Sequence, residues 1–123
     1  MAPARKAFTG LAYLFVLGIV IEVFLAGLGI FGDFHKHLDP HRAFGNVLVL
    51  VALVLLVLAM AGRLGRLIVG LTAALVVLLV LQSIWVRIDN RWVESIHPAM
   101  AIVLFALGHQ LARLSRQPGI ATA

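Results

Sequence analysis

Four long apolar runs, separated by short polar segments, dominate the chain. They cover residues 8–30, 43–62, 67–86 and 98–114. The length of each run is near what an α-helix needs to cross the hydrocarbon core of a bilayer, which is about 20 residues. The apolar residues are continuous rather than alternating, which argues against transmembrane strands, and a helix satisfies its own backbone hydrogen bonds in lipid. The pattern predicts an all-α membrane protein with one domain, residues 1–123, built as an up-down-up-down four-helix transmembrane bundle.

Composition excludes a soluble protein. Hydrophobic residues make up 63% of the 123 residues and charged residues only 12%, whereas soluble domains are about 45–50% apolar. The chain has no cysteine, which excludes disulfides, thiolate metal ligands and covalent attachment of haem. The sequence contains no Ser-His-Asp set, Walker loop or HExxH motif, so it favours a role other than catalysis.

Basic residues are unevenly distributed between the two ends of the predicted bundle. Six of them flank one end without any acidic residue among them: Arg5, Lys6, Arg63, Arg66, Arg113 and Arg116. The other end carries four basic and four acidic residues: Lys36, Arg42, Arg87, Arg91, Asp33, Asp39, Asp89 and Glu94. The positive-inside rule therefore predicts a multi-pass protein of the cell inner (cytoplasmic) membrane with both termini in the cytoplasm. We interpret the net charge of +5 as a topology signal, with the lipid bilayer rather than nucleic acid as the partner.

The second and fourth apolar runs carry a repeat. At an offset of 56 residues (97 minus 41), the segment His41-Arg-Ala-Phe-Gly45 aligns with His97-Pro-Ala-Met-Ala101. Along one helical face, both runs read His, small, Leu, small, Leu: His41, Gly45, Leu48, Ala52 and Leu55, then His97, Ala101, Leu104, Gly108 and Leu111. This i, i+4, i+7 spacing indicates a parallel duplication of a two-helix hairpin.

The repeat predicts a pair of facing histidines. The second and fourth helices of such a bundle run in the same direction and tend to lie on a diagonal, so His41 and His97 are expected at one depth. Gly45 and Ala101 lie one turn further along and leave a slot for a flat macrocycle. Neutral imidazole is the usual axial ligand of haem iron, so we expect His41 and His97 to bind one haem b.

Two resemblances accompany these residues. The His-Arg-Ala-Phe-Gly and His-Pro-Ala-Met-Ala elements resemble those of an uncharacterised family of small four-span bacterial membrane proteins, over most of the chain. The placement of one histidine on each of two diagonal helices is similar to that in transmembrane b-type cytochromes, of the cytochrome b and haem A synthase kind. That resemblance implies His41 and His97 as the axial pair. Many such cytochromes hold a second haem, whereas here His109 has no counterpart on the second run, so one haem at most is implied.

A second candidate site lies between the first and second runs. Asp33, His35, His37, Asp39 and His41 occupy every second position, and in an extended chain they would share one face. Their nitrogen and oxygen atoms suit Zn²⁺, Cu²⁺ or Ni²⁺. A solvated loop whose polar residues keep it out of the bilayer is the alternative interpretation.

Glu22 is the one acidic residue inside an apolar run. A carboxyl group is costly in lipid, so it is expected to face the bundle interior. Gln82 and Ser83 are the predicted hydrogen-bond partners, and Glu22 and Gln82 are expected to shape the outer pocket around the haem. A proton relay or a quinone contact, and a purely structural hydrogen bond, remain open roles for Glu22.

The sequence thus favours a membrane-embedded b-type haem protein with an electron-transfer role. One alternative is an accessory or scaffold subunit of a larger membrane complex, or of a homo-oligomer, whose small-residue faces dock neighbouring helices. Another is a metal-binding or small-solute membrane protein that uses the Asp33 to His41 cluster.

Overall fold

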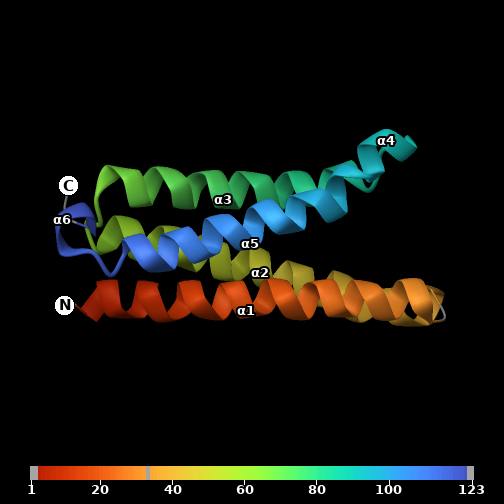
Figure 1. The fold of residues 1–123 in the computed structure, drawn as a ribbon, viewed down its shortest axis with the longest axis horizontal. Coiled ribbons are helices and arrows are strands. Elements are labelled where there is room, and N and C mark those ends of the chain that lie inside the picture. Colours follow the sequence, from red (N-terminus) through yellow and green to blue (C-terminus); the bar gives the residue numbers. More distant parts are fainter. Residues whose placement is uncertain (1–2, 33, 122–123) are drawn as a thin grey trace.

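The computed structural model is a bundle of four long helices with two single-turn helices (Figure 1). It describes residues 3–32 and 34–121, with the side chains of residues 34–38 and 121 excepted. The helices are α1 (Pro3–Phe31), α2 (Phe34–Ala61), α3 (Arg66–Trp85), α4 (Arg91–Glu94), α5 (Ile96–Leu114) and α6 (Pro118–Ala121). The described residues contain no strand. The prediction of an all-α four-helix bundle is confirmed, and α1, α2, α3 and α5 each include nearly all of one predicted apolar run.

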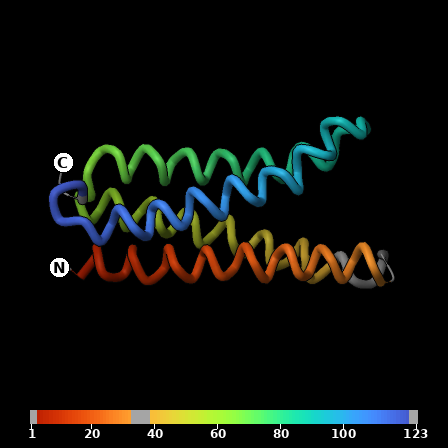
Figure 2. The backbone as a smooth tube through the Cα atoms, viewed as in Figure 1, coloured from red at the N-terminus to blue at the C-terminus, as the bar shows by residue number. Residues whose placement is uncertain are grey.

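The long helices pack in a ring. α1 packs on α2 and α5, and α3 packs on the same two helices, so α2 faces α5 across one diagonal and α1 faces α3 across the other. The backbone trace in Figure 2 shows both chain ends at the same end of the bundle, as an up-down-up-down order requires. The two members of the sequence repeat therefore lie on opposite sides of the bundle interior.

The outside of the bundle is apolar. Large hydrophobic side chains such as Leu14 (62% exposed), Phe24 (63%) and Ile102 (72%) point away from the core. Four helical segments are long and apolar enough to cross a membrane: Pro3–Phe31, Asp39–Ala61, Arg66–Trp85 and Arg91–Leu114. A soluble protein rarely exposes so much contiguous apolar surface, which fits a lipid environment.

The segment between the first two spans differs from expectation. The backbone of α2 is already helical from Phe34, so residues 34–41 do not have the extended conformation in which alternate side chains would share one face. Successive helical residues are rotated by about 100°, so alternate positions do not share a face as they do in a strand. Pro40 lies inside α2, where its ring removes one backbone N–H donor from the hydrogen bonds of the helix.

The repeated face of α2 and α5 forms half of the core. Gly45 and Ala101, directly below the histidines, are half-buried, and every later position of the repeat is buried: Leu48, Ala52 and Leu55 on α2, and Leu104, Gly108 and Leu111 on α5. The pattern extends one step beyond the predicted stripe, to Ala59 and Ser115, both fully buried. The small residues let the two faces approach, and the leucines fill the space between them.

A second repeat, between α1 and α3, forms the other half of the core. At an offset of 60 residues (68 minus 8), the buried positions of the two helices coincide: Phe8, Ala12, Phe15 and Ile19 with Ile68, Thr72, Leu75 and Leu79. Continued by one more turn at the same offset, the buried face of α1 reaches Glu22 and that of α3 reaches Gln82. The two hairpins are thus related by an approximate two-fold axis along the bundle. The connection within the first hairpin is four residues longer than that within the second (60 minus 56).

The turn between α2 and α3 depends on one residue in the left-handed region. Leu64 N–H donates to the Ala59 carbonyl (2.9 Å) and Arg63 N–H to the Met60 carbonyl (3.1 Å), which is the Schellman pattern of a helix end. Arg63 has φ 50°, where glycine is usual. The turn reverses the chain within four residues and so joins the halves of the repeat.

Gly108 marks the closest approach of α5 to α1. A Cβ at this position would lie 2.9 Å from Phe15 Cδ1 and 3.2 Å from Val16 Cγ2. We expect Gly108→Leu to destabilise the protein in detergent by about 1–3 kcal/mol through overpacking. Thermal unfolding followed by circular dichroism measures this. Gly70→Leu is the matched control, because nothing lies within 4 Å of a Cβ there; equal stability of the two variants would contradict this packing.

Candidate functional site

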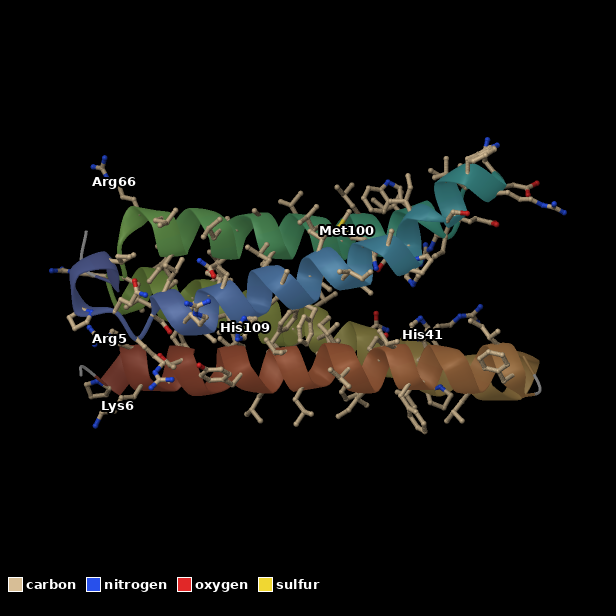
Figure 3. The ribbon with its side chains drawn as sticks, viewed as in Figure 1. Arg5, Lys6, His41, Arg66, Met100 and His109 are labelled. Carbon is tan, nitrogen blue, oxygen red and sulfur yellow. The ribbon has the colours of Figure 1, made fainter. Side chains whose placement is uncertain are left out.

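The two histidines of the repeat meet inside the bundle. His41 projects from α2 and His97 from α5, and their ring centroids are 5.9 Å apart with the planes at 80°. Both residues are half-buried. Figure 3 shows His41 toward the end of the bundle away from Arg5 and Lys6. The rings therefore lie against one another between α2 and α5, toward the end of the bundle opposite the chain termini.

Each histidine is held by a backbone carbonyl of its own hairpin. His41 Nδ1 lies 3.3 Å from the Glu22 carbonyl oxygen, and His97 Nδ1 lies 3.2 Å from the Gln82 carbonyl oxygen. A carbonyl only accepts, so Nδ1 of each ring carries the hydrogen. Nε2 of each ring is then the unprotonated nitrogen with a lone pair for a ligand. The approximate two-fold symmetry of the fold thus extends to the tautomers of the histidines.

The side chains of Glu22 and Gln82 break this symmetry. Glu22 Oε1 lies 3.2 Å from His41 Nδ1, so one ring N–H is shared between the carboxyl group and the carbonyl of the same residue. Gln82 instead uses its amide, because Nε2 donates to the His97 carbonyl at 3.0 Å. His41 therefore contacts an acidic side chain, whereas the hydrogen-bond partners of His97 are neutral.

The predicted partners of Glu22 were wrong. Glu22 contacts His41, while Gln82 binds His97 and Ser83 is exposed. The reason is the bundle order, since α1 and α3 lie on a diagonal and their side chains do not meet at this level. A signal for the correct partners is present in the sequence. The i, i+4, i+7 pattern of α1 and α3 ends at Glu22 and Gln82, which places each of them beside the histidine of its own hairpin.

Two buried oxygen atoms near the rings have no hydrogen-bond partner. They are Glu22 Oε2 and Gln82 Oε1, at equivalent positions of the two hairpins. An unsatisfied buried acceptor costs free energy, so a water or a ligand with a donor group would stabilise each one. The surroundings of the histidines are therefore polar within an otherwise apolar bundle.

The slot expected beside the histidines is only partly open. A Cβ on Gly45 would lie 2.8 Å from Glu22 Oε1, so the carboxyl group of Glu22 covers Gly45. Ala101, the equivalent residue of α5, borders an apolar groove of about 420 Å³ between α1 and α5. Ile19 and Val23 form one wall of this groove and Pro98 is in the other. Open space thus adjoins Ala101 on the outside of the α1/α5 contact, whereas the carboxyl group of Glu22 covers the equivalent Gly45.

The outer cluster is mostly beyond what the structure describes. Asp33 lies outside the described residues, and so do the side chains of His35 and His37. Asp39 is exposed and lies 3.8 Å from Arg42 Nη1. Within the described side chains, no three His, Asp or Glu residues are close enough to hold a metal ion.

His109 lies on the other side of α5. It is exposed, on the outside of the bundle, and Figure 3 shows it nearer to the end that carries Arg5. It has no part in the central pair, which makes it a natural control for His41 and His97.

Comparisons with known proteins place the chain in a family without assigning a role. A model described as a family of unknown function (DUF6220) matches residues 22–88, just over half of the 123 residues. The match begins at Glu22, includes His41 and Gln82, and ends before His97. Neither the comparison with curated proteins nor that with solved structures found a match.

Proposed function

Because this chain belongs to the DUF6220 family, whose function is unknown, we propose a function from its own geometry: a membrane-embedded protein that binds one b-type haem through His41 and His97 and transfers electrons. The observation that supports it is the opposed ring pair, 5.9 Å between centroids. Two imidazoles that share one ion, at metal–nitrogen distances of about 2.0–2.1 Å, have ring centres about 6 Å apart. The spacing suits a bis-histidine centre.

The hydrogen bonds of the two rings favour the same function. Histidines that bind a metal through one nitrogen usually donate the other N–H to a carbonyl or carboxylate, which fixes the ring and raises its basicity. Here both Nδ1 atoms have such partners, on Glu22 and Gln82. Among the described side chains the donor set is two nitrogens without a third metal ligand, which fits axial ligation of a macrocycle better than a bare metal ion.

The protein's residues supply position and environment, and the haem iron, when bound, supplies one-electron exchange. Helices α2 and α5 hold the rings at one depth, and the leucine and small residues beneath them keep water from the bundle interior. Ala101 borders the apolar α1/α5 groove, which Pro98, the residue after His97, also lines. Glu22 places a carboxyl group on His41 alone, so the two axial ligands differ in electron donation.

We further propose an orientation and a setting for the pair. The six basic residues at the end opposite His41 favour a cytoplasmic position for both termini, in the cell inner membrane. The histidines then lie near the outer surface, where a redox partner outside the cell membrane or in a neighbouring subunit can approach. The apolar exterior of the bundle suits docking of other membrane subunits or of a second copy.

Absorption spectroscopy tests the proposed function. We expect the protein, produced in cells with sufficient haem and purified in detergent, to show the reduced bands of a low-spin b-type centre. Extraction as the pyridine complex should give about one haem per chain, because there is one histidine pair. A protein that is well folded by circular dichroism and remains colourless after addition of hemin would refute the proposal, and would favour the accessory-subunit alternative.

A further inference from the structure

The end of the bundle opposite the histidines carries an unbalanced positive charge. Arg5 and Lys6 begin α1, Arg63 and Arg66 flank the α2–α3 turn, and two more arginines, Arg113 and Arg116, end α5. Figure 3 shows Arg5, Lys6 and Arg66 together at this end. All five acidic residues of the chain fall at positions 22, 33, 39, 89 and 94, in or beyond the other half of the bundle. No acidic side chain that the structure describes forms an ion pair with any of these six cations.

Two of the cations sit beside a fixed contact between α1 and α5. The hydroxyl groups of Thr9 and Ser115 are 2.8 Å apart, and Ser115 is fully buried. Thr9 also donates to the carbonyl of Arg5 at 2.8 Å, one turn earlier on α1. Arg116 follows Ser115 directly. The hydroxyl contact therefore holds the backbones that carry Arg5 and Arg116 close together.

The guanidinium groups of this pair are incompletely satisfied. Arg5 is half-buried, and its Nε is buried without an acceptor. Arg116 is exposed and reaches only the hydroxyl of Tyr13, at 3.5 Å. A buried guanidinium N–H requires an acceptor, and arginine forms its strongest hydrogen bonds with planar or tetrahedral oxyanions. The two guanidinium groups can therefore bind a further oxygen ligand, and their positive charge favours an anionic one.

We propose that Arg5 and Arg116 bind the phosphate of an anionic phospholipid at the α1/α5 edge of this end. The site lies where a membrane-spanning helix meets the headgroup region, so a lipid phosphate is at the right depth without any further partner. Lys6 and Arg113, both exposed on the same two helices, add long-range attraction. Each basic residue near a negatively charged membrane surface contributes about 1 kcal/mol. This site does not depend on haem and lies at the opposite end of the bundle.

Lipid retention measured by native mass spectrometry tests this site. We expect the wild-type protein, taken from mixed phosphatidylglycerol and phosphatidylcholine vesicles, to retain phosphatidylglycerol preferentially. Arg5→Ala and Arg116→Ala should each lower that retention about fivefold, as the loss of one basic contact implies. Arg5→Lys should retain part of the preference, because it keeps the charge but loses the planar fork.

Arg91→Ala is the matched control. Arg91 is exposed at the other end of the bundle, in α4, and its loss changes the net charge equally. Retention that falls as much in Arg91→Ala as in Arg5→Ala would overturn the proposal, because it would reflect net charge alone. Unchanged retention in both Arg5→Ala and Arg116→Ala, with native helix content by circular dichroism, would overturn it as well. Equal retention of the two lipids by the wild-type protein would mean that the basic residues act only in topology.

Discussion

Replacement of either His41 or His97 by alanine should remove haem from the purified protein, whereas His109→Ala should keep its full haem content. Each proposed ligand would supply one of the two bonds that hold the haem, and even partners that only orient a metal ligand contribute about 10–100-fold to affinity. We expect at least a tenfold loss of bound haem in each variant, measured as the pyridine complex per mole of chain. Both single variants are expected to lose haem, because the remaining histidine cannot take the place of the missing one.

The design separates loss of a ligand from loss of the fold. His109 lies on the same helix as His97 but is exposed, so its replacement controls for a general effect of removing histidine from α5. His97→Gly with added imidazole should restore the low-spin spectrum, because free imidazole fills the space of the missing ring. Wild-type haem content in His41→Ala or in His97→Ala would contradict the proposed axial pair.

The fold was predictable because it depends on length and hydrophobicity alone. Each apolar run is long enough to cross the bilayer, and lipid leaves the helix as the form without unsatisfied backbone groups. The order of the helices then follows from short connections, such as the four-residue turn at Arg63. The His41/His97 pairing was predictable as well, because a repeat on parallel helices places equivalent residues at equivalent depth.

The details around the pair were not predictable from the pattern used. Assignment of Gln82 to Glu22 assumed that any two polar groups at similar depth would meet, but the bundle order keeps α1 and α3 apart. The helical start of α2 was also missed, because polar residues near a proline are typical of both loops and helix beginnings. The stripe shared by α1 and α3 was present in the sequence, but dense apolar runs hide the face on which helices pack.

The two hairpins are approximately symmetric, but one has a carboxyl group, on Glu22, where the other has an amide, on Gln82. The bundle places Glu22 and Gln82 at equivalent positions, each beside the histidine of its own hairpin. An amide at both positions would satisfy the same geometry, as Gln82 shows by its bond to the His97 carbonyl. Packing therefore does not require a carboxyl group at position 22, and the acid is better explained by its effect on His41.

The substitutions Glu22→Gln and Gln82→Glu should move the reduction potential of the proposed haem in opposite directions. Glu22→Gln removes a negative charge from His41, which makes the oxidised centre less stable, so the midpoint potential should rise. At an effective dielectric constant of about 20, a unit charge at a separation of about 7 Å is worth about 2 kcal/mol, or about 100 mV for a one-electron couple. Gln82→Glu adds the equivalent charge beside His97 and should lower the potential by a similar amount.

Redox titration of the absorption spectrum measures both shifts, with Glu94→Gln as the control. Glu94 is an exposed acid in α4, so its loss changes the net charge of the protein by the same amount. Solvent screens its charge, and the electrostatic potential at the histidine rings therefore changes much less. We expect Glu94→Gln to leave the potential nearly unchanged. If Glu22→Gln also leaves it unchanged while haem is bound, the carboxyl group carries no charge at His41, and its role is the structural hydrogen bond instead. A shift confined to Glu22→Gln and Gln82→Glu would show that the histidine partners set the potential of this centre.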